Sequence, residues 1–222
     1  MFNKRLAIFD LDNTILDGDS DFGFINFLAE ENIIPDSYKE TNQRYMDAYL
    51  NGTLQMEDWG KFSLVFYDGK TAEDIKETME RFFKEVFEPM INIFALKKIH
   101  HHYENNDYLL LATATNEIIA KFAAARLGFD DYVATKIVKK EQTIYTNQIE
   151  FPPAFKEGKL TMVQQWIEDQ KWEGGQSFFY SDSVNDLPLL EYVSHPIATN
   201  PDNQLREIAE ERGWDILDLP RI

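Results

Sequence analysis

Apolar positions divide the chain into segments with strand character and segments with helical periodicity. The run Leu6–Phe9 is short and unbroken, which is typical of a strand buried on both faces of a parallel sheet. Further candidate strands alternate with candidate helices, the strands at 108–112, 132–138, 177–180, 195–198 and 214–217 and the helices at 91–103, 116–127, 159–166 and 202–212. This alternation predicts an α/β fold with a doubly wound, mostly parallel sheet and a Rossmann-like core.

A different pattern separates the first strand from the others. From Ser20 to about Phe87, aromatic and apolar residues recur at helical spacing in four short segments, and no strand is expected there. Pro89 is expected to end the last of these helices. We therefore predict a small helical bundle inserted as a cap at 17–88, with 1–16 and 89–222 forming the core. A surface hairpin centred on Asn147 is expected within 143–151.

Composition restricts the kinds of partner. The chain of 222 residues carries 39 acidic residues against 22 Lys and Arg, and its net charge of −17 repels nucleic acid and anionic membrane surfaces. It has no cysteine, which excludes disulfides, thiolate metal sites and thiol chemistry. No apolar run approaches a membrane span, and the four apolar residues after Arg5 are far short of a signal-peptide core. We expect a cytoplasmic monomer or homodimer without nucleic-acid or membrane partners.

Two carboxylates directly follow the first strand. Asp10 and Asp12 lie where ligands bind in open α/β sheets, beyond the carboxyl ends of the strands. At an effective dielectric constant of roughly 20 they would repel each other by about 4 kcal/mol if both stayed charged, so the pair implies a cation or a shared proton. The alternative is an ordinary turn in which the Asp side chains accept hydrogen bonds from backbone amides.

Side chains of complementary chemistry fall at the ends of later strands or beside them. They are Thr113, Lys159, Asp182 and Asp186. Asp10, Asp182 and the backbone near Asp12 offer hard oxygen ligands, which suit Mg²⁺. Lys159 and such an ion would supply the local positive charge that a phosphate group needs in an acidic protein.

In order and residue type, these segments resemble the four motifs of the haloacid dehalogenase superfamily of phosphohydrolases. The helical insert after the first motif is similar to that of its phosphoserine phosphatase-like branch, subfamily IB. The corresponding stretches are Asp10-Leu-Asp12-Asn-Thr14, Thr113 after Leu109-Leu-Leu-Ala, Lys159 after Glu157-Gly158, and Asp182-Ser-Val-Asn185-Asp186. Together they cover nearly the whole chain and are far more specific than any one of them alone.

The resemblance implies a Mg²⁺-dependent phosphatase that hydrolyses a small phosphorylated metabolite. It implies Asp10 as the nucleophile that forms an aspartyl-phosphate, and Asp12 as the general acid and base. Thr14 is expected to fix the loop. The remaining implied roles are Thr113, Lys159 and Asn185 for the phosphoryl oxygens, and Asp10, Asp182 and the Asp12 carbonyl for Mg²⁺, with Asp186 as a further or outer ligand.

The second motif departs from the phosphoserine phosphatases. These usually follow the motif Ser with two glycines, whereas this chain reads Thr113-Ala-Thr115-Asn116 and places side chains where bare backbone approaches the substrate. Phosphoserine is therefore disfavoured. The variant resembles a sister group often linked to histidinol phosphate or left unassigned, so the substrate stays open. A phosphotransferase or mutase of the same fold, or a non-catalytic binding protein, is the alternative function.

Several other polar residues are expected to be structural. Consecutive helical residues point to different faces, so His100-His101-His102 favours an exposed polar turn over a metal site. Asp17 and Asp19 are expected to serve helix capping and solvation of the cap entrance. For Arg44 and Arg81 two interpretations stay open, binding of a substrate carboxylate and surface ion pairs with the many acidic residues.

Overall fold

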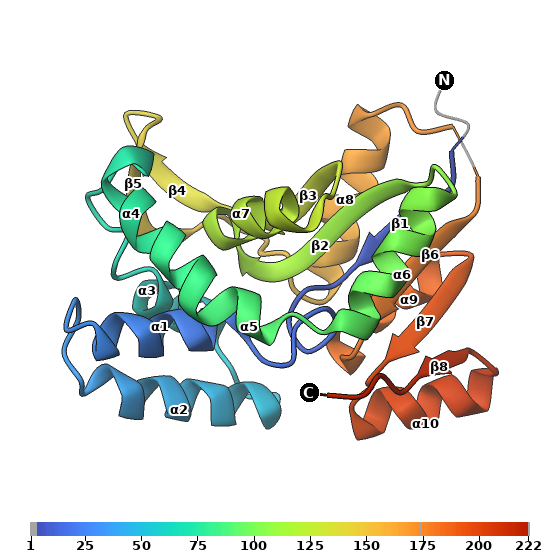
Figure 1. The fold of residues 1–222 in the computed structure, drawn as a ribbon, viewed down its shortest axis with the longest axis horizontal. Coiled ribbons are helices and arrows are strands. Elements are labelled where there is room, and N and C mark those ends of the chain that lie inside the picture. The colour runs from blue at the N-terminus through green and yellow to red at the C-terminus, as the bar shows by residue number, and fades with distance from the viewer. Residues whose placement is uncertain (1–3, 174, 222) are drawn as a thin grey trace. The chain divides into compact units, whose positions relative to one another are not determined.

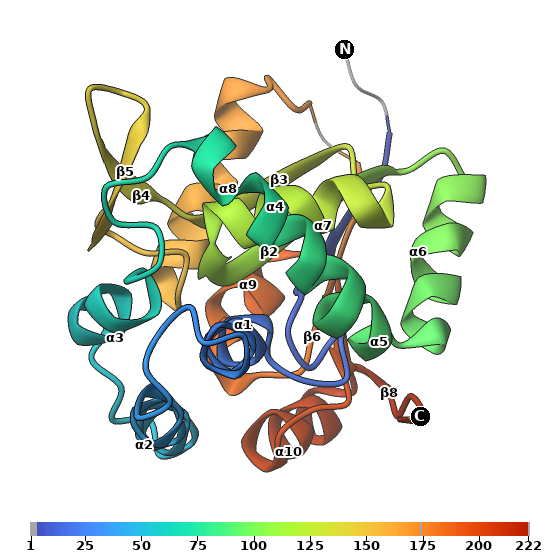
Figure 2. The ribbon, with the colours of Figure 1, turned by 60° about the vertical axis from the view of Figure 1, so that its left-hand side comes forward.

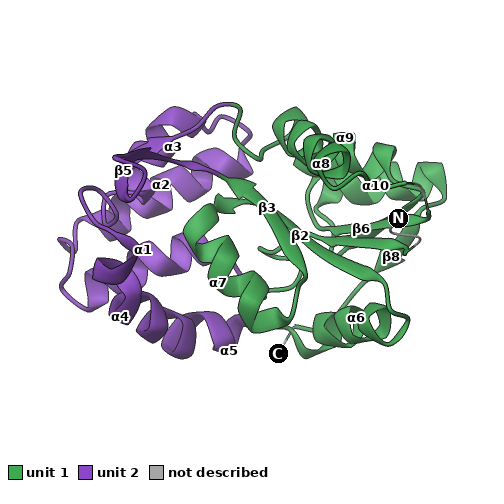
Figure 3. Ribbon diagram, turned by 90° about the horizontal axis from the view of Figure 1, so that it is seen from above, with its two compact units in different colours: residues 1–17, 91–135, 152–222 green, residues 18–90, 136–151 purple. Residues whose placement is uncertain are grey.

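The computed structural model describes residues 4–173 and 175–221, and the chain divides into two compact units. Unit 1 consists of Met1–Asp17, Ile91–Thr135 and Pro152–Ile222, and unit 2 of Gly18–Met90 and Lys136–Phe151 (Figure 3). The division expected from the sequence assigned 136–151 to the core. In the structure this segment belongs with the helical insert.

Among the described residues, six strands of unit 1 form one parallel sheet in the order β3-β2-β1-β6-β7-β8 (Figure 1). The strand order runs outward in opposite directions from the junction of β1 and β6, which makes this junction the switch point where ligands of such sheets bind. The predicted doubly wound α/β fold is confirmed. The strands are β1 (Leu6–Phe9), β2 (Tyr108–Asn116), β3 (Asp131–Thr135), β6 (Ser177–Ser181), β7 (His195–Thr199) and β8 (Asp215–Leu217).

Helices cover both faces of this sheet because its central strands are apolar on both sides. Leu6 and Ile8 face an apolar cluster that includes Val163 and Leu189, while Phe9 packs toward the opposite face against His102. Figure 1 shows α6 and α7 in front of the sheet and α8 behind it. The helices are α6 (Ile93–Glu104), α7 (Glu117–Leu127), α8 (Glu157–Asp169), α9 (Leu187–Tyr192) and α10 (Asn203–Arg212).

Strand β2 is longer and less regular than expected. The sequence predicted an end at Ala112, but the strand continues to Asn116. Ala112 pairs with Val133 and Asn116 with Thr135, so β2 has two more residues than β3 between these pairs and must bulge. Asn116 then caps α7 by accepting hydrogen bonds from the second and third amides of the helix, at 3.1 and 3.2 Å.

Unit 2 contains an aromatic helical bundle. Helices α1 and α2 lie side by side (Figures 1 and 2). Phe24 contacts Phe66, Tyr67 and Phe82, and all four rings are buried, as expected for a bundle core. The helices are α1 (Ser20–Glu30), α2 (Tyr38–Leu50), α3 (Met56–Ser63), α4 (Ala72–Phe82) and α5 (Glu88–Met90).

The expected helix break at Pro89 is wrong. A π-helical turn, Phe83–Phe87, joins α4 to α5, and Pro89 lies inside α5. In the π turn the amide of Glu88 donates to the carbonyl of Phe83, five residues back. We attribute the tolerance of proline to this wider register, because proline cannot donate the bond that a regular helix would need here.

The hairpin also differs from expectation. Strand β4 (Ile137–Lys140) pairs antiparallel with β5 (Ile144–Ile149), so the expected strand 132–138 is two strands that belong to different sheets. The turn lies at Glu141 and Gln142, whose φ values are 51° and 64°, and not at Asn147. Glu and Gln are uncommon in this left-handed conformation, so these two residues did not indicate a turn.

One of the three consecutive histidines is buried, contrary to the expected exposed turn. His102 is 2% exposed, with Nδ1 2.7 Å from Asp107 and Nε2 2.9 Å from the hydroxyl of Tyr180. Arg5 donates two hydrogen bonds of 2.8 Å to Asp107 and completes a polar chain within unit 1. His102 is the histidine that the helical phase turns toward the sheet, whereas His100 and His101 are exposed.

No helix in the described ranges is both long enough and apolar enough to cross a bilayer.

Candidate active site

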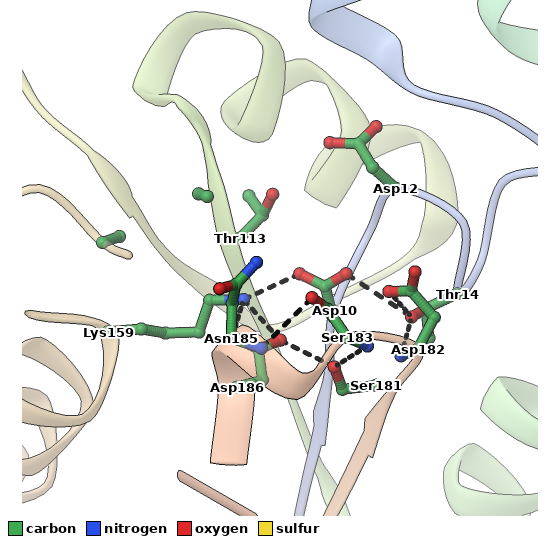
Figure 4. A network of polar contacts seen from close by, with 12 residues as sticks. Asp10, Asp12, Thr14, Thr113, Lys159, Ser181, Asp182, Ser183, Asn185 and Asp186 are labelled. Carbon is green, nitrogen blue, oxygen red and sulfur yellow. Dashed lines mark hydrogen bonds and ion pairs between the residues drawn. The ribbon is translucent and has the colours of Figure 1, made fainter. Parts of the chain in front are cut away.

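Asp10 lies at the tip of β1, beside the switch point of the sheet. Its amide donates to the carbonyl of Tyr180 at 2.9 Å, which extends the β1–β6 ladder by one residue. Phe9 is level with Leu111 and Tyr180. Asp10 therefore follows at the level of Ser181, the last residue of β6, whereas β2 continues beyond it to Asn116. Its side chain is buried, and Figure 4 shows it at the centre of a polar network.

Lys159, in the first turn of α8, is tied to two carboxylates. Its Nζ donates to Asp10 Oδ1 at 2.9 Å and to Asp186 Oδ2 at 2.8 Å, and the residue is 2% exposed. Burial favours the neutral amine, but the carboxylates of Asp10 and Asp186 outweigh it and raise the pKa of Lys159 above its ordinary value. The side chain is therefore a fixed, buried cation.

The backbone before Lys159 explains how this cation reaches the site. A Cβ on Gly158 would lie 2.0 Å from the carbonyl oxygen of Pro153, so only glycine allows this close approach. Lys156, just before α8, adopts a φ of 54°, which is uncommon for a residue with a side chain. The chain thus enters the helix through a sharply constrained turn that fixes where Lys159 begins.

Thr14 connects Asp10 with the fourth motif. Its hydroxyl lies 3.4 Å from Asp10 Oδ2 and 3.2 Å from Asp182 Oδ1, and it accepts a hydrogen bond of 3.0 Å from the Asp182 amide. The carboxylates of Asp10 and Asp182 therefore approach the same point. Thr14 fixes the loop, as the sequence predicted.

The site carries more negative than positive charge. Burial raises the pKa of the Asp10 carboxyl; Lys159 opposes this shift, while Asp186 and Asp12 reinforce it. Burial and then the charges of Asp10 and Asp186 raise the pKa of Asp182 well above its usual range. Raised carboxyl pKa values mean that a further cation would be stabilising here.

The donor set fits Mg²⁺. Asp10 and Asp182 present hard oxygens around Thr14, whereas the oxygens of Asp186 are engaged by Lys159 and by the Ser181 hydroxyl at 2.7 Å. Within the described residues, no group of three or more His, Asp or Glu side chains forms a ready metal cage. Mg²⁺ commonly uses one or two protein carboxylates and keeps several waters.

Three further predicted residues lie at the same end of the sheet. Thr113 is buried, and its hydroxyl accepts a hydrogen bond of 3.1 Å from the Thr115 amide. Asn185 belongs to the turn Val184–Asp186, and its amide donates to Ser183 Oγ at 3.2 Å. Figure 4 shows the carboxyl group of Asp12 turned away from Asp10 and outside the drawn network.

Some residues of the site were not found from the sequence. Asp202 accepts a hydrogen bond of 2.7 Å from the Val184 amide, and its own amide donates to the Asp182 carbonyl at 2.7 Å. Asp202 also caps α10, and this position before a helix was the only feature of Asp202 that the local sequence indicated. Ser181 donates to the carboxylate of Asp186 around a turn, and Thr115 donates to that of Asp12 from a distant segment. Hydrophobic patterning indicates neither contact.

The residues expected to be structural have structural partners. Asp17 accepts a hydrogen bond from Asn92 at 2.9 Å, and Asp19 caps α1. Arg81 pairs with Glu31 at 2.7 Å and with Glu85 at 3.3 Å. Arg44 instead donates to the hydroxyl of Thr41.

Comparison with known proteins agrees with this geometry. The sequence pattern of the haloacid dehalogenase-like hydrolases matches residues 7–191. The chain belongs to this family. The chain is 33% identical over 220 residues to a histidinol-phosphatase of Neisseria meningitidis serogroup C (strain 8013), covering 97% of this chain and 99% of that protein. The prediction of a phosphoric monoester hydrolase of the haloacid dehalogenase superfamily is confirmed.

Solved structures of this family share the fold. A Bordetella pertussis Tohama I protein of unknown function is 36% identical, with a TM-score of 0.91, and the match covers 98% of this chain and 100% of that one. A phosphoserine phosphatase, solved as a phospho-aspartyl intermediate analogue, is 15% identical with a TM-score of 0.69, covering 99% and 95% of the two chains. At that identity the second likeness supports the fold alone.

Proposed function

We propose that this haloacid dehalogenase-like hydrolase is a Mg²⁺-dependent phosphatase that cleaves small phosphomonoesters through an aspartyl-phosphate on Asp10. One observation carries the proposal. Asp10 is a buried carboxylate at the switch point of the sheet, with the ammonium of Lys159 on one oxygen and the Thr14–Asp182 pair beside the other. This arrangement provides a nucleophile next to positive charge that can hold a phosphoryl group.

In the first step, Lys159, Thr113 and Asn185 hold the phosphoryl oxygens while a carboxylate oxygen of Asp10 attacks phosphorus. The new bond joins this oxygen to phosphorus, and the bond from phosphorus to the ester oxygen breaks. Asp12 gives its proton to the departing alkoxide, which leaves as an alcohol. Lys159 favours the ionised form of Asp10 through their hydrogen bond of 2.9 Å.

In the second step, water attacks the phosphorus of the acyl phosphate. Asp12, now ionised, takes the proton of this water. The bond between phosphorus and the Asp10 oxygen breaks, which releases inorganic phosphate and restores the carboxylate. Mg²⁺ bound by Asp10, Asp182 and the Asp12 carbonyl would neutralise negative charge on the phosphoryl group. We assign Asp186 to the outer shell, because its oxygens hold Lys159 and Ser181.

For the substrate we propose histidinol phosphate or a closely similar amino-alcohol phosphate. The support is the relative named histidinol-phosphatase, which matches nearly the full length of both chains. The sequence Thr113-Ala-Thr115 adds side chains where phosphoserine phosphatases usually have glycine, which disfavours phosphoserine. The motif residues are proposed to contact only the phosphoryl group and Mg²⁺. We therefore assign the selection of the leaving group to the helical insert, acting as a mobile lid.

A panel of phosphomonoesters assayed with Mg²⁺ tests this function. We expect phosphate release from small alkyl phosphates, fastest with histidinol phosphate, and loss of turnover in excess EDTA that added Mg²⁺ restores. Including alcohol acceptors distinguishes a phosphotransferase, which would yield a new ester in place of inorganic phosphate. Activity in excess EDTA would contradict the metal assignment, and a phosphopeptide as the best substrate would contradict the substrate class.

A further inference from the structure

We propose that Thr115 is a positioning residue that holds the Asp12 carboxylate for proton transfer and so adapts the enzyme to esters with poor leaving groups. The inference rests on the proposed role of Asp12 as general acid and base. It adds a residue of the second motif whose side chain would act through Asp12 and not on the phosphate.

The contact between the two residues is short. Thr115 Oγ1 donates to Asp12 Oδ2 at 2.5 Å, although the residues are 103 positions apart in the sequence. Thr115 is 3% exposed, whereas Asp12 is half-buried. A short hydrogen bond to a carboxylate is among the stronger neutral-to-charged contacts. It restricts rotation of the carboxyl group and therefore fixes where its other oxygen lies.

The bulge of β2 holds Thr115 in place. Between the pairs Ala112–Val133 and Asn116–Thr135 the strand leaves the regular ladder, so its amides are available for other partners. The hydroxyl of Thr135 donates to the Ala114 carbonyl at 2.7 Å and accepts from the Ala154 amide at 3.1 Å. The bulge is therefore held by Thr135 of β3, whose hydroxyl is itself held by the segment that leads to α8.

Thr115 also orients the phosphate-binding hydroxyl. Its amide donates to Thr113 Oγ1 at 3.1 Å. A hydroxyl whose oxygen accepts from a backbone amide keeps its proton as a donor, and a phosphoryl oxygen is the acceptor expected in this site. The backbone of Thr115 thus serves Thr113 and its side chain serves Asp12. Glycine at this position could provide only the first contact.

The chemical consequence depends on the leaving group. An alkoxide is a strong base and leaves only when protonated, whereas p-nitrophenolate leaves without a proton. A residue that positions the general acid should therefore matter for alkyl phosphates and much less for p-nitrophenyl phosphate in the step that forms the aspartyl-phosphate.

Two matched variants test the proposal, Thr115→Val, which keeps the shape without the hydroxyl, and Thr115→Ser, which keeps the hydroxyl. Rapid-quench experiments with Mg²⁺ measure how fast the first equivalent of leaving group is released. The two substrates are the fastest alkyl phosphate of the panel, which releases an alcohol, and p-nitrophenyl phosphate, which releases p-nitrophenol. For Thr115→Val we expect the alkyl rate to fall by about 10- to 100-fold and the aryl rate by less than about threefold. Thr115→Ser should restore the alkyl rate to within about threefold of the parent.

Equal losses on both esters, or a Ser variant as slow as the Val variant, would overturn the proposal. The ratio of the two rates is measured within each variant, so a fraction of unfolded protein does not change it. If Thr115→Val does not fold, Thr115→Ala gives the same comparison. Absence of turnover in the parent would contradict the proposed phosphatase function, whereas parent turnover with an unchanged ratio would contradict only the role of Thr115.

Discussion

At the scale of single residues, the surroundings of Lys159 favour the proposed role of a cation that binds an anionic substrate. Its ammonium is buried and bonded to Asp10 and Asp186, while α8 approaches Pro153 closely enough that residue 158 must be glycine. A buried lysine that merely balanced charge would need no such constrained turn. In a protein of net charge −17, a fixed cation beside Asp10 would supply the positive charge that the proposed anionic substrate needs.

Replacing this cation tests its role. Lys159→Met keeps much of the length but removes the charge, and we expect kcat/KM to fall by about 10²- to 10³-fold or more, as for other preorganised electrostatic contacts. The exposed Lys140, changed to Met, is the control and should retain parent activity. Phosphate release under Mg²⁺ saturation is the measurement. A Lys159→Met enzyme within about threefold of the parent would remove this residue from the account.

At the scale of secondary structure, elements with strong local signals were predicted from the sequence. The run Leu6–Phe9 is a strand, and α7 is bounded by the capping Asn116 and by Gly128, whose φ is 77°. Elements defined by distant partners were not predicted. The segment after Thr135 leaves the sheet because β4 pairs with β5. Lys136 lies at the change, but a single charged residue within an expected strand does not by itself indicate a second sheet.

The site shows the same distinction between local and distant information. Residues adjacent to strand ends, such as Asp10 and Asp182, could be placed because parallel strands bring their carboxyl ends together. The contact of Thr115 with Asp12 spans 103 residues, and the bulge that permits it depends on the hydroxyl of Thr135. Such contacts depend on tertiary geometry, which residue spacing does not specify.

The entry into α8 gives a test at this scale. Gly158→Ala would place a Cβ 2.0 Å from the Pro153 carbonyl oxygen, so the turn must shift and carry Lys159 with it. We expect a loss of stability of about 1 to 3 kcal/mol in urea unfolding, together with a strong loss of phosphatase activity. Gly23→Ala is the matched control, because its Cβ would have an ordinary contact of 3.4 Å with Val86 within a helix. Parent-like stability and activity in Gly158→Ala would contradict this reading of the turn.

At the scale of the whole molecule, the polar chain Arg5–Asp107–His102–Tyr180, which is buried at all residues but Arg5, links stability to pH. Burial lowers the pKa of His102 despite the hydrogen bond to Asp107. Burial would raise the pKa of Asp107, but hydrogen bonds with Arg5 and His102 bring it below its usual range. Burial raises the pKa of Tyr180 to about 12, so its hydroxyl keeps its proton. His102 is therefore neutral in the folded protein, with Nδ1 donating to Asp107 and Nε2 accepting from Tyr180.

The sign of the pH effect follows from these shifts. Below the ordinary histidine pKa of about 6.5 the unfolded chain binds a proton that the folded protein resists, so this group lowers stability as pH falls from about 7 toward 5. Asp10 and Asp182, with raised pKa values, give the opposite slope. We therefore compare the parent with His102→Gln. Urea midpoints should converge as pH falls, and a difference that is constant or grows toward pH 5 would contradict the assignment.

The central claim is that catalysis passes through a phosphoryl group on Asp10. The most direct measurement is an acid quench of enzyme turning over its best phosphomonoester with Mg²⁺, followed by peptide mapping by mass spectrometry. We expect a phosphoryl group on Asp10 of the parent enzyme. In Asp10→Asn, whose fold is checked by its thermal unfolding, we expect no phosphorylated peptide and no turnover. Full turnover by a folded Asp10→Asn protein, or a phosphoryl group trapped on another residue, would contradict the central claim.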